Sequence, residues 1–241
     1  RSQLADPAWA KKAKEGRASD IKPCINCLIG CIDRGMLSHT PIHCTVNPSL
    51  YRFECKPVEK AETRKQVAVV GAGPAGCEAA LTASKRGHQV TIYEKRCIGG
   101  AMIEASKPEN KANIKRLIHY YEDHIMHDPN ITLVKKEVEY ETLVHRGYDA
   151  VIIAVGGKTR ILNVPGIEKN SVIYASDYLN GSTAVTGNTV VVIGGGITGA
   201  ETALELNAEG KKVTIVEMTD AFLANLVPLV RHILQRSMKQ T

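Results

Sequence analysis

The chain has 241 residues, of which 44% are hydrophobic and 23% charged, a composition typical of a folded globular protein. The net charge is +6, but basic residues are spread along the chain without interleaved aromatics, which argues against nucleic-acid binding. The longest apolar runs are too short to span a bilayer and no signal peptide is recognisable, so we expect no membrane partner and a cytoplasmic location.

The first quarter of the chain has little regular pattern. Residues 5–20 predict a short polar helix, with Asp6 as its N-cap and Pro7 at the first helical position. Residues 21–58 show neither helical nor strand periodicity and are rich in proline and glycine. A loop-rich segment with so little apolar material needs a staple, and a metal centre would supply one.

Cysteines are concentrated in this segment with the spacing C-x2-C-x3-C-x12-C. Zinc ribbons usually present two C-x2-C knuckles, and only one is found here. The spacing favours a [4Fe–4S] cluster, while zinc and inert thiols remain alternatives. The predicted metal ligands are Cys24, Cys27, Cys31 and Cys44. The other three cysteines do not fit this spacing: Cys55, and also Cys77 and Cys97, which we expect to be buried and inert.

From residue 66 onward the pattern is that of alternating strands and helices. Residues 66–70 predict a buried strand that runs into a glycine turn, and residues 74–87 a helix that stops at Gly87. A second strand follows, then an amphipathic helix over residues 108–127 and another buried strand within residues 149–157. This order predicts an α/β fold with parallel strands.

The chain contains one strand–turn–helix–strand unit twice. Residues 67–94 align with residues 190–217 without a gap, and nearly half of the aligned positions are identical. Each copy carries G-x-G-x-x-G after a strand and reaches a glutamate at the end of the next strand, which is the arrangement that binds dinucleotides. The repeat predicts a tandem Rossmann-like fold preceded by the loop-rich iron–sulfur segment.

Each residue type in the motif has a physical role. The first glycine permits a tight turn, the second lets the backbone approach a diphosphate, the third allows close packing, and the glutamate accepts ribose hydroxyls. We expect FAD at the first copy and NADH at the second. The predicted cofactor-binding residues are Gly71, Gly73, Pro74, Ala75, Gly76, Glu94, Lys95, Gly99, Gly100, Val138, Ala154, Gly156, Gly194, Gly196, Ile197, Thr198, Gly199 and Glu217.

The residues after the second motif indicate which nicotinamide nucleotide it takes. Glu217 is followed by Met218, Thr219 and Asp220, with no arginine to receive a 2′-phosphate and two acids to repel one. We therefore predict NADH over NADPH.

The segments "KPCINCLIGCIDRG…HCTVNP" and the two glycine units, in this order, resemble the multi-domain NADH:flavin oxidoreductases, the family of 2,4-dienoyl-CoA reductase, 2-enoate reductase and trimethylamine dehydrogenase. The resemblance implies an FMN-binding barrel ahead of this chain, which would be a piece of a longer protein. It implies that residues 1–20 are the exit helix of that barrel, 21–58 the cluster segment, 64–160 the first part of the FAD (or ADP) domain and 161–241 an incomplete NAD(P)H domain.

The function implied by the resemblance is electron transfer from NADH through FAD and the cluster to FMN, for reduction of an activated C=C bond. The small-molecule substrate would bind in the absent domain, the catalytic residues are not identified, and a homo-oligomer is possible. One alternative is an amine dehydrogenase with ADP in the first site; another is a zinc-stabilised nucleotide-binding interaction module.

Overall fold

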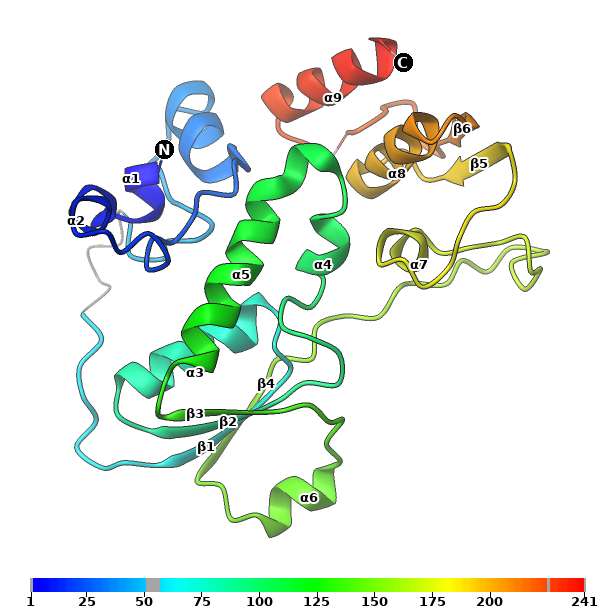
Figure 1. Ribbon diagram of the computed structural model, residues 1–241. Coiled ribbons are helices and arrows are strands. Elements are labelled where there is room, and N and C mark those ends of the chain that lie inside the picture. The colour runs from blue at the N-terminus through cyan, green and yellow to red at the C-terminus, as the bar shows by residue number, and fades with distance from the viewer. Residues whose placement is uncertain (1, 51–56, 225, 241) are drawn as a thin grey trace. The chain divides into compact units, whose positions relative to one another are not determined.

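A computed structural model of the chain describes residues 2–50, 57–224 and 226–240 (Figure 1). The chain forms two compact units. The first unit comprises Arg1–Asn26, Cys44–Ser106 and Lys111–Lys158, and the second comprises Cys27–His43, Lys107–Asn110 and Thr159–Thr241. None of the helices in the described ranges is both long enough and apolar enough to cross a membrane.

The first unit is built on a parallel four-stranded sheet with the order β3-β2-β1-β4. The strands are β1 (Gln66–Val70), β2 (Gln89–Tyr93), β3 (Ile131–Val134) and β4 (Ala150–Ile153). Every neighbouring pair is parallel, so each connection must cross over the sheet, and the helices lie in these crossovers (Figure 1). The predicted α/β class is therefore confirmed.

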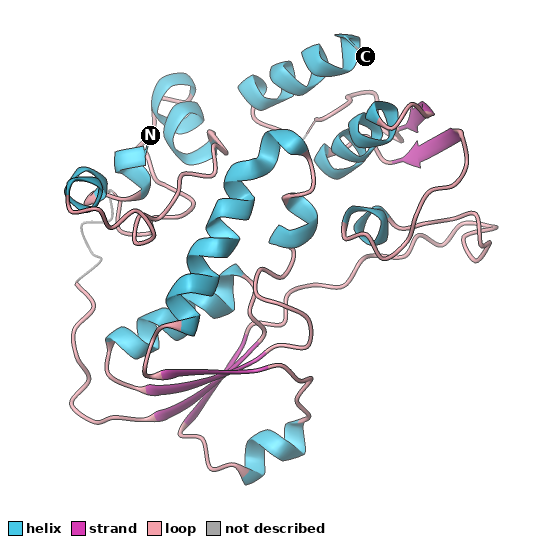
Figure 2. Ribbon diagram, in the orientation of Figure 1, coloured by secondary structure: helices cyan, strands magenta, loops and turns pink. Residues whose placement is uncertain are grey.

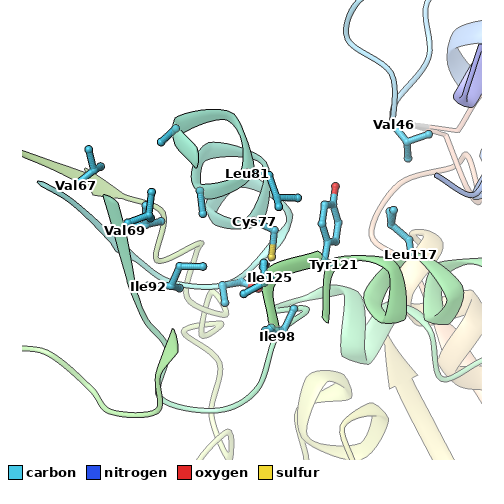
Figure 3. Packing of buried hydrophobic residues seen from close by; sticks show 14 of the residues in the cluster. Val46, Val67, Val69, Cys77, Leu81, Ile92, Ile98, Leu117, Tyr121 and Ile125 are labelled. Carbon is cyan, nitrogen blue, oxygen red and sulfur yellow. Dashed lines mark hydrogen bonds between the residues drawn. The ribbon is translucent and has the colours of Figure 1, made fainter. Parts of the chain in front are cut away.

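Two helices, α3 (Pro74–Lys85) and α5 (Ala112–Met126), pack on this sheet and form the main core. Figure 3 shows Cys77 and Leu81 of α3 close to Ile92 of β2 and to Ile125 and Tyr121 of α5. Complete burial of a side chain such as Ile92 or Ile125 stabilises the fold by about 1.5–3 kcal/mol. The short elements α4 (Met102–Ala105), η2 (Glu109–Lys111) and α6 (Tyr140–His145) lie in the connections between strands.

Strand β4 departs from the expectation that it is buried. Val151, Ile152 and Ile153 are 41%, 36% and 65% exposed. β4 stands at the end of the strand order and pairs with β1 alone among the described strands. The apolar run predicted the strand correctly, but its burial depends on what covers the edge and face, which the run itself does not encode.

The N-terminal segment contains two short helices, α1 (Ser2–Ala5) and α2 (Trp9–Lys14). The second starts later and ends earlier than the predicted helix over residues 5–20, and its N-cap is Ala8 and not Asp6. Asp6 Oδ1 instead accepts the backbone N–H of Ala8 at 3.0 Å in a turn ahead of the helix. Burial works against ionisation of Asp6, but the bond from Lys12 at 2.7 Å and the N–H of Lys22 hold its pKa below the usual value.

The second unit contains a two-stranded parallel sheet of β5 (Thr189–Ile193) and β6 (Lys212–Val216), joined by α8 (Ile197–Ala208). It also contains α7 (Ala175–Leu179), α9 (Pro228–Gln240) and a nine-residue π-helical element, η1 (Ile29–Leu37). Figure 2 shows long loops between β4 and α7 and between α7 and β5. Small cores form around Leu206 and around Leu223, while Ile193 and Val191 of β5 are 64% and 58% exposed.

Candidate functional site: two glycine turns and a cysteine segment

The first glycine turn connects β1 to α3. Gly71 has φ of +100°, a conformation that favours glycine, and a Cβ there would lie 2.4 Å from the carbonyl oxygen of Ala154. Its N–H donates to the carbonyl of Tyr93 at the end of β2. At Gly76 a Cβ would lie 1.9 Å from the Gly71 oxygen, so the third glycine permits the close approach of helix and turn that the motif predicts.

The second glycine of this turn faces more open space. A Cβ on Gly73 would meet nothing nearer than the Cα of Gly100 at 3.8 Å, which is ordinary contact. Gly73 is the N-cap of α3, and in the described part of the chain no side chain caps this helix. The first backbone N–H groups, including those of Ala75 and Gly76, have no partner within the helix. The turn thus offers N–H donors and the positive end of a helix dipole, which suit a diphosphate.

Glu94 is fixed next to this turn. It is only 9% exposed, and its carboxylate accepts the N–H of Ala72 at 2.7 Å and that of Arg96 at 2.8 Å. A carboxylate has about four acceptor positions, so it can accept further donors, such as ribose hydroxyls.

The structure brings most of the other predicted residues of the first copy to the turn. Gly99 donates its N–H to Ala72 at 2.8 Å, and a Cβ on Gly100 would lie 2.8 Å from the Cα of Gly73. Ala154 follows β4 and donates to Val70 at 2.8 Å. Gly99, Gly100 and Ala154 therefore line the same end of the sheet as the G-x-G-x-x-G turn.

Three predicted residues of the first copy lie outside the glycine turn itself. Lys95 forms an exposed ion pair with Glu137 at 2.9 Å, and the half-buried Val138 follows that glutamate in an otherwise exposed loop. Gly156 has φ of +72°, and a Cβ there would meet no atom within 4 Å.

The second glycine turn repeats the backbone of the first, although a Cβ on Gly194 would meet nothing within 4 Å. Gly194 has φ of +106°, and its N–H donates to the last residue of β6 at 2.8 Å. A Cβ on Gly199 would lie 1.9 Å from the Gly194 oxygen, the same distance as in the first copy. Gly196 is the N-cap of α8, ahead of Ile197 and Thr198, and a Cβ on it would meet nothing within 4 Å.

Glu217 occupies the place of Glu94 in the second copy. Its carboxylate accepts the N–H of Gly195 at 2.6 Å, and from Thr219 both the N–H at 2.9 Å and the hydroxyl at 3.0 Å. The N–H of Thr219, followed by that of Gly195, lowers the pKa of Glu217 below its ordinary value. The group is thus an ionised acceptor at neutral pH, beside a turn built like the first.

Around the first cysteines the backbone has unusual local geometry. Asn26 and Leu28, on either side of Cys27, have φ of +55° and +60°, although neither is glycine. The N–H of Asn26 donates to Cys24 Sγ at 3.4 Å. The bond holds Cys24 against the left-handed turn that follows it.

A second backbone contact joins the chain ahead of the later two cysteines. The N–H of His43 donates to the carbonyl of Gly30 at 2.8 Å, and these residues immediately precede Cys44 and Cys31. A Cβ on Gly30 would lie 2.4 Å from the His43 oxygen, so only glycine permits this approach.

The four cysteines suit a metal centre by chemistry, because all are partly exposed thiols in a loop-rich segment. Within the described ranges, however, no three His, Cys, Asp or Glu side chains are arranged to hold a metal ion. Cys24 and Cys44 belong to the first unit, and Cys27 and Cys31 to the second. The cluster therefore stays a prediction.

Of the remaining cysteines, Cys77 is buried as expected, and burial raises the pKa of its thiol to about 12. Cys97 is exposed, which corrects the expectation that it is buried; its neighbour Ile98 fills the core instead. Cys55 lies outside the described residues.

Sequence reasoning missed the contact of Lys22 with Glu78 of α3 and, through that carboxylate, with Tyr121 of α5. Lys22 and Glu78 are 56 residues apart, and no motif links them. It also missed η1, because the i→i+5 hydrogen bonds of a π-helix do not give the 3.6-residue apolar period that indicates an α-helix.

Each of the two glycine turns follows a parallel strand and lies beside its own glutamate. This arrangement, present twice in one chain, defines the class of proteins that bind two dinucleotides. Residues 65–241 match the family of pyridine nucleotide-disulphide oxidoreductases, and because this is well over half of the chain, the chain belongs to that family.

Individual relatives agree with this assignment. The chain is 40% identical over 236 residues to an NADH oxidase of Thermoanaerobacter brockii, covering 96% of this chain and 36% of that protein. It is 35% identical over 225 residues to a cinnamate reductase of Clostridium sporogenes, covering 92% and 33%. A solved structure of 2-naphthoyl-CoA reductase with 2-naphthoyl-CoA superposes with a TM-score of 0.93 at 33% identity, covering 100% of this chain and 36% of that one. The chain thus spans about a third of the length of these relatives.

Proposed function

We propose that the chain is the dinucleotide-binding part of an NADH-dependent flavin oxidoreductase that reduces an activated C=C bond. The observation that carries this proposal is the matched pair of glycine turns, each with a glutamate held by two backbone N–H groups. The names of two relatives, a cinnamate reductase and a 2-naphthoyl-CoA reductase, support an unsaturated acid or acyl thioester as the substrate class.

The first turn would hold FAD. Gly73 and the start of α3 would bind its diphosphate, Gly99 and Gly100 would border it, and Glu94 would accept its ribose hydroxyls. The second turn would hold NADH in the same way, through Gly196, the N-terminus of α8 and Glu217.

Cys24, Cys27, Cys31 and Cys44 would hold a [4Fe–4S] cluster. When bound, these groups would supply a route for electrons from NADH through FAD and the cluster to an FMN held by another part of the protein. Residues 1–241 would bind and orient FAD, NADH and the cluster, and the substrate would be reduced in another part of the protein.

The test is the cofactor content of the protein purified anaerobically with iron and sulfide. We expect iron and sulfide in equal amounts, and FAD in the nucleotide released on denaturation. ADP in place of FAD would support the amine dehydrogenase alternative, and a colourless protein with stoichiometric zinc would support the interaction module.

Nucleotide preference provides a separate test. The ionised Glu217 and the nearby Asp220 would repel a 2′-phosphate, so NADH should reduce the flavin faster than NADPH at equal concentration. A clear preference for NADPH in stopped-flow flavin reduction would overturn this part of the proposal.

A further inference from the structure

Lys22, two residues ahead of the first predicted cluster ligand, is tied to the helix of the first glycine turn. Its ammonium forms an ion pair with Glu78, in the second turn of α3, and its side chain is only 15% exposed. The hydroxyl of Tyr121 on α5 donates to the same carboxylate oxygen at 2.7 Å. One glutamate thus joins the cysteine segment, α3 and α5 within the first unit.

The surroundings of Lys22 restrain it further. Its Nζ lies 5.6 Å from the ring centroid of Tyr121 and 5.8 Å from that of Tyr120, within the range of cation–π attraction. Burial, and then the Glu78 carboxylate, raises the pKa of Tyr121, so the phenol keeps the proton that it donates. The backbone N–H of Lys22 donates to Asp6 at 3.0 Å, and Asp6 is only 5% exposed.

The chain between this contact and the first thiol is short. Only Pro23 separates Lys22 from Cys24, and proline fixes its own backbone angle φ. Cys24 packs against the core of the first unit and accepts the N–H of Asn26. A shift of Lys22 away from α3 would therefore move Cys24 as well. On the other side of the contact, Glu78 lies two residues after Gly76, the last glycine of the first turn.

We propose that Glu78 is a positioning residue: through Lys22 it sets the place of Cys24 relative to the first glycine turn. The inference rests on the proposed function, because it assigns the contact a role only if Cys24 binds a cluster and the turn binds a dinucleotide. The Lys22–Glu78 ion pair would then hold the cluster and the dinucleotide of the first turn in a fixed relation without touching either group.

The experiment compares iron retention in the anaerobically purified protein. Glu78→Gln keeps an acceptor for Tyr121 but removes the charge, and Lys22→Met removes the cation. The double variant Lys22→Glu with Glu78→Lys exchanges the charges and restores the attraction. The matched control is Glu15→Gln, which removes an ion pair with Arg17 in which both side chains are more than 40% exposed.

We expect each single substitution to make iron loss to a chelator about ten-fold faster, the size of effect seen when residues behind a metal ligand are changed. We also expect a shift in the electron paramagnetic resonance signal of the reduced cluster. FAD content should be unchanged, which shows that α3 is intact. The charge exchange should restore part of the iron retention, because a lysine at position 78 restores the ion pair but cannot accept the Tyr121 hydroxyl. Glu15→Gln should match the wild-type protein.

The inference is overturned if Glu78→Gln loses iron no faster than Glu15→Gln, or if the charge exchange restores nothing. Tyr121→Phe, which removes one hydroxyl, provides a milder variant and should show a smaller change in the same direction. A wild-type protein that holds no iron would overturn the proposed function and this inference together, which separates that result from a failure of the Glu78 contact alone.

Discussion

Substitution by alanine should have different effects at the two later glycines of the second turn, Gly196 and Gly199. A Cβ at Gly196 meets no atom within 4 Å, and the residue has φ of −74° and ψ of −175°, which alanine adopts readily. A Cβ at Gly199 lies 1.9 Å from the Gly194 carbonyl oxygen, a backbone atom that cannot move without opening the turn. Gly196→Ala therefore tests binding, and Gly199→Ala tests folding.

The magnitudes follow from these contacts. At Gly196 alanine lowers the entropy of the unfolded chain, which stabilises by about 0.4–1 kcal/mol, but it is a poorer N-cap than glycine by a similar amount. The free energy of unfolding should therefore change by less than about 0.5 kcal/mol. The added methyl group would stand where the diphosphate must approach, and an overpacking cost of about 1–3 kcal/mol corresponds to roughly 5- to 150-fold weaker NADH binding.

Isothermal titration with NADH and urea unfolding followed by circular dichroism measure the two quantities separately. Gly199→Ala should lower the free energy of unfolding by at least about 1–3 kcal/mol. Wild-type affinity for NADH in Gly196→Ala would refute the placement of the diphosphate at this backbone. Unfolding of the same variant would refute the open space found around Gly196.

Three further results are expected. Gly30→Ala places a Cβ 2.4 Å from the His43 oxygen, so iron content should fall by more than half, and wild-type iron would contradict the role of this contact. Iodoacetamide should label Cys97 in the native protein and spare Cys77, whose burial raises its pKa to about 12; mass spectrometry of digests would show the reverse if the assignment is wrong. Because the pKa of Glu217 lies below its ordinary value of 4.5, NADH affinity should stay constant from neutral pH to about pH 5 and fall only at lower pH, as the carboxylate gains a proton. A decline already near pH 6 in titrations would contradict this.

The glycine turns could be predicted from the sequence because their requirements are local. A tight turn needs φ near +100° at Gly71 and Gly194, and the close approach of helix to turn needs glycine five residues later. The spacing of the glycines and of the following glutamate therefore predicted the positions of both turns, both helices and both glutamates. The helix around Leu117 and Tyr121 was also predictable, because its apolar period reflects a face that packs on the sheet.

Features that depend on distant parts of the chain could not be predicted. The exposure of Ile153 is set by what lies beside β4, and the ion pair of Lys22 with Glu78 is set by how the N-terminal segment folds back on α3. Cys97 and Ile98 are neighbours of residue types that are both often buried, yet only Ile98 enters the core. Composition does not distinguish these cases, because the neighbours in space decide them.

The double hydrogen bonding of Glu94 and Glu217 has a thermodynamic consequence for ligand capture. Each carboxylate is immobilised by N–H groups of its own turn, so the rotational freedom of its side chain is lost during folding and not during association. For the buried Glu94, immobilising the side chain costs about 0.5–1.5 kcal/mol, which an arriving nucleotide does not have to supply. Preorganised acceptors of this kind favour rapid docking with little rearrangement of the protein.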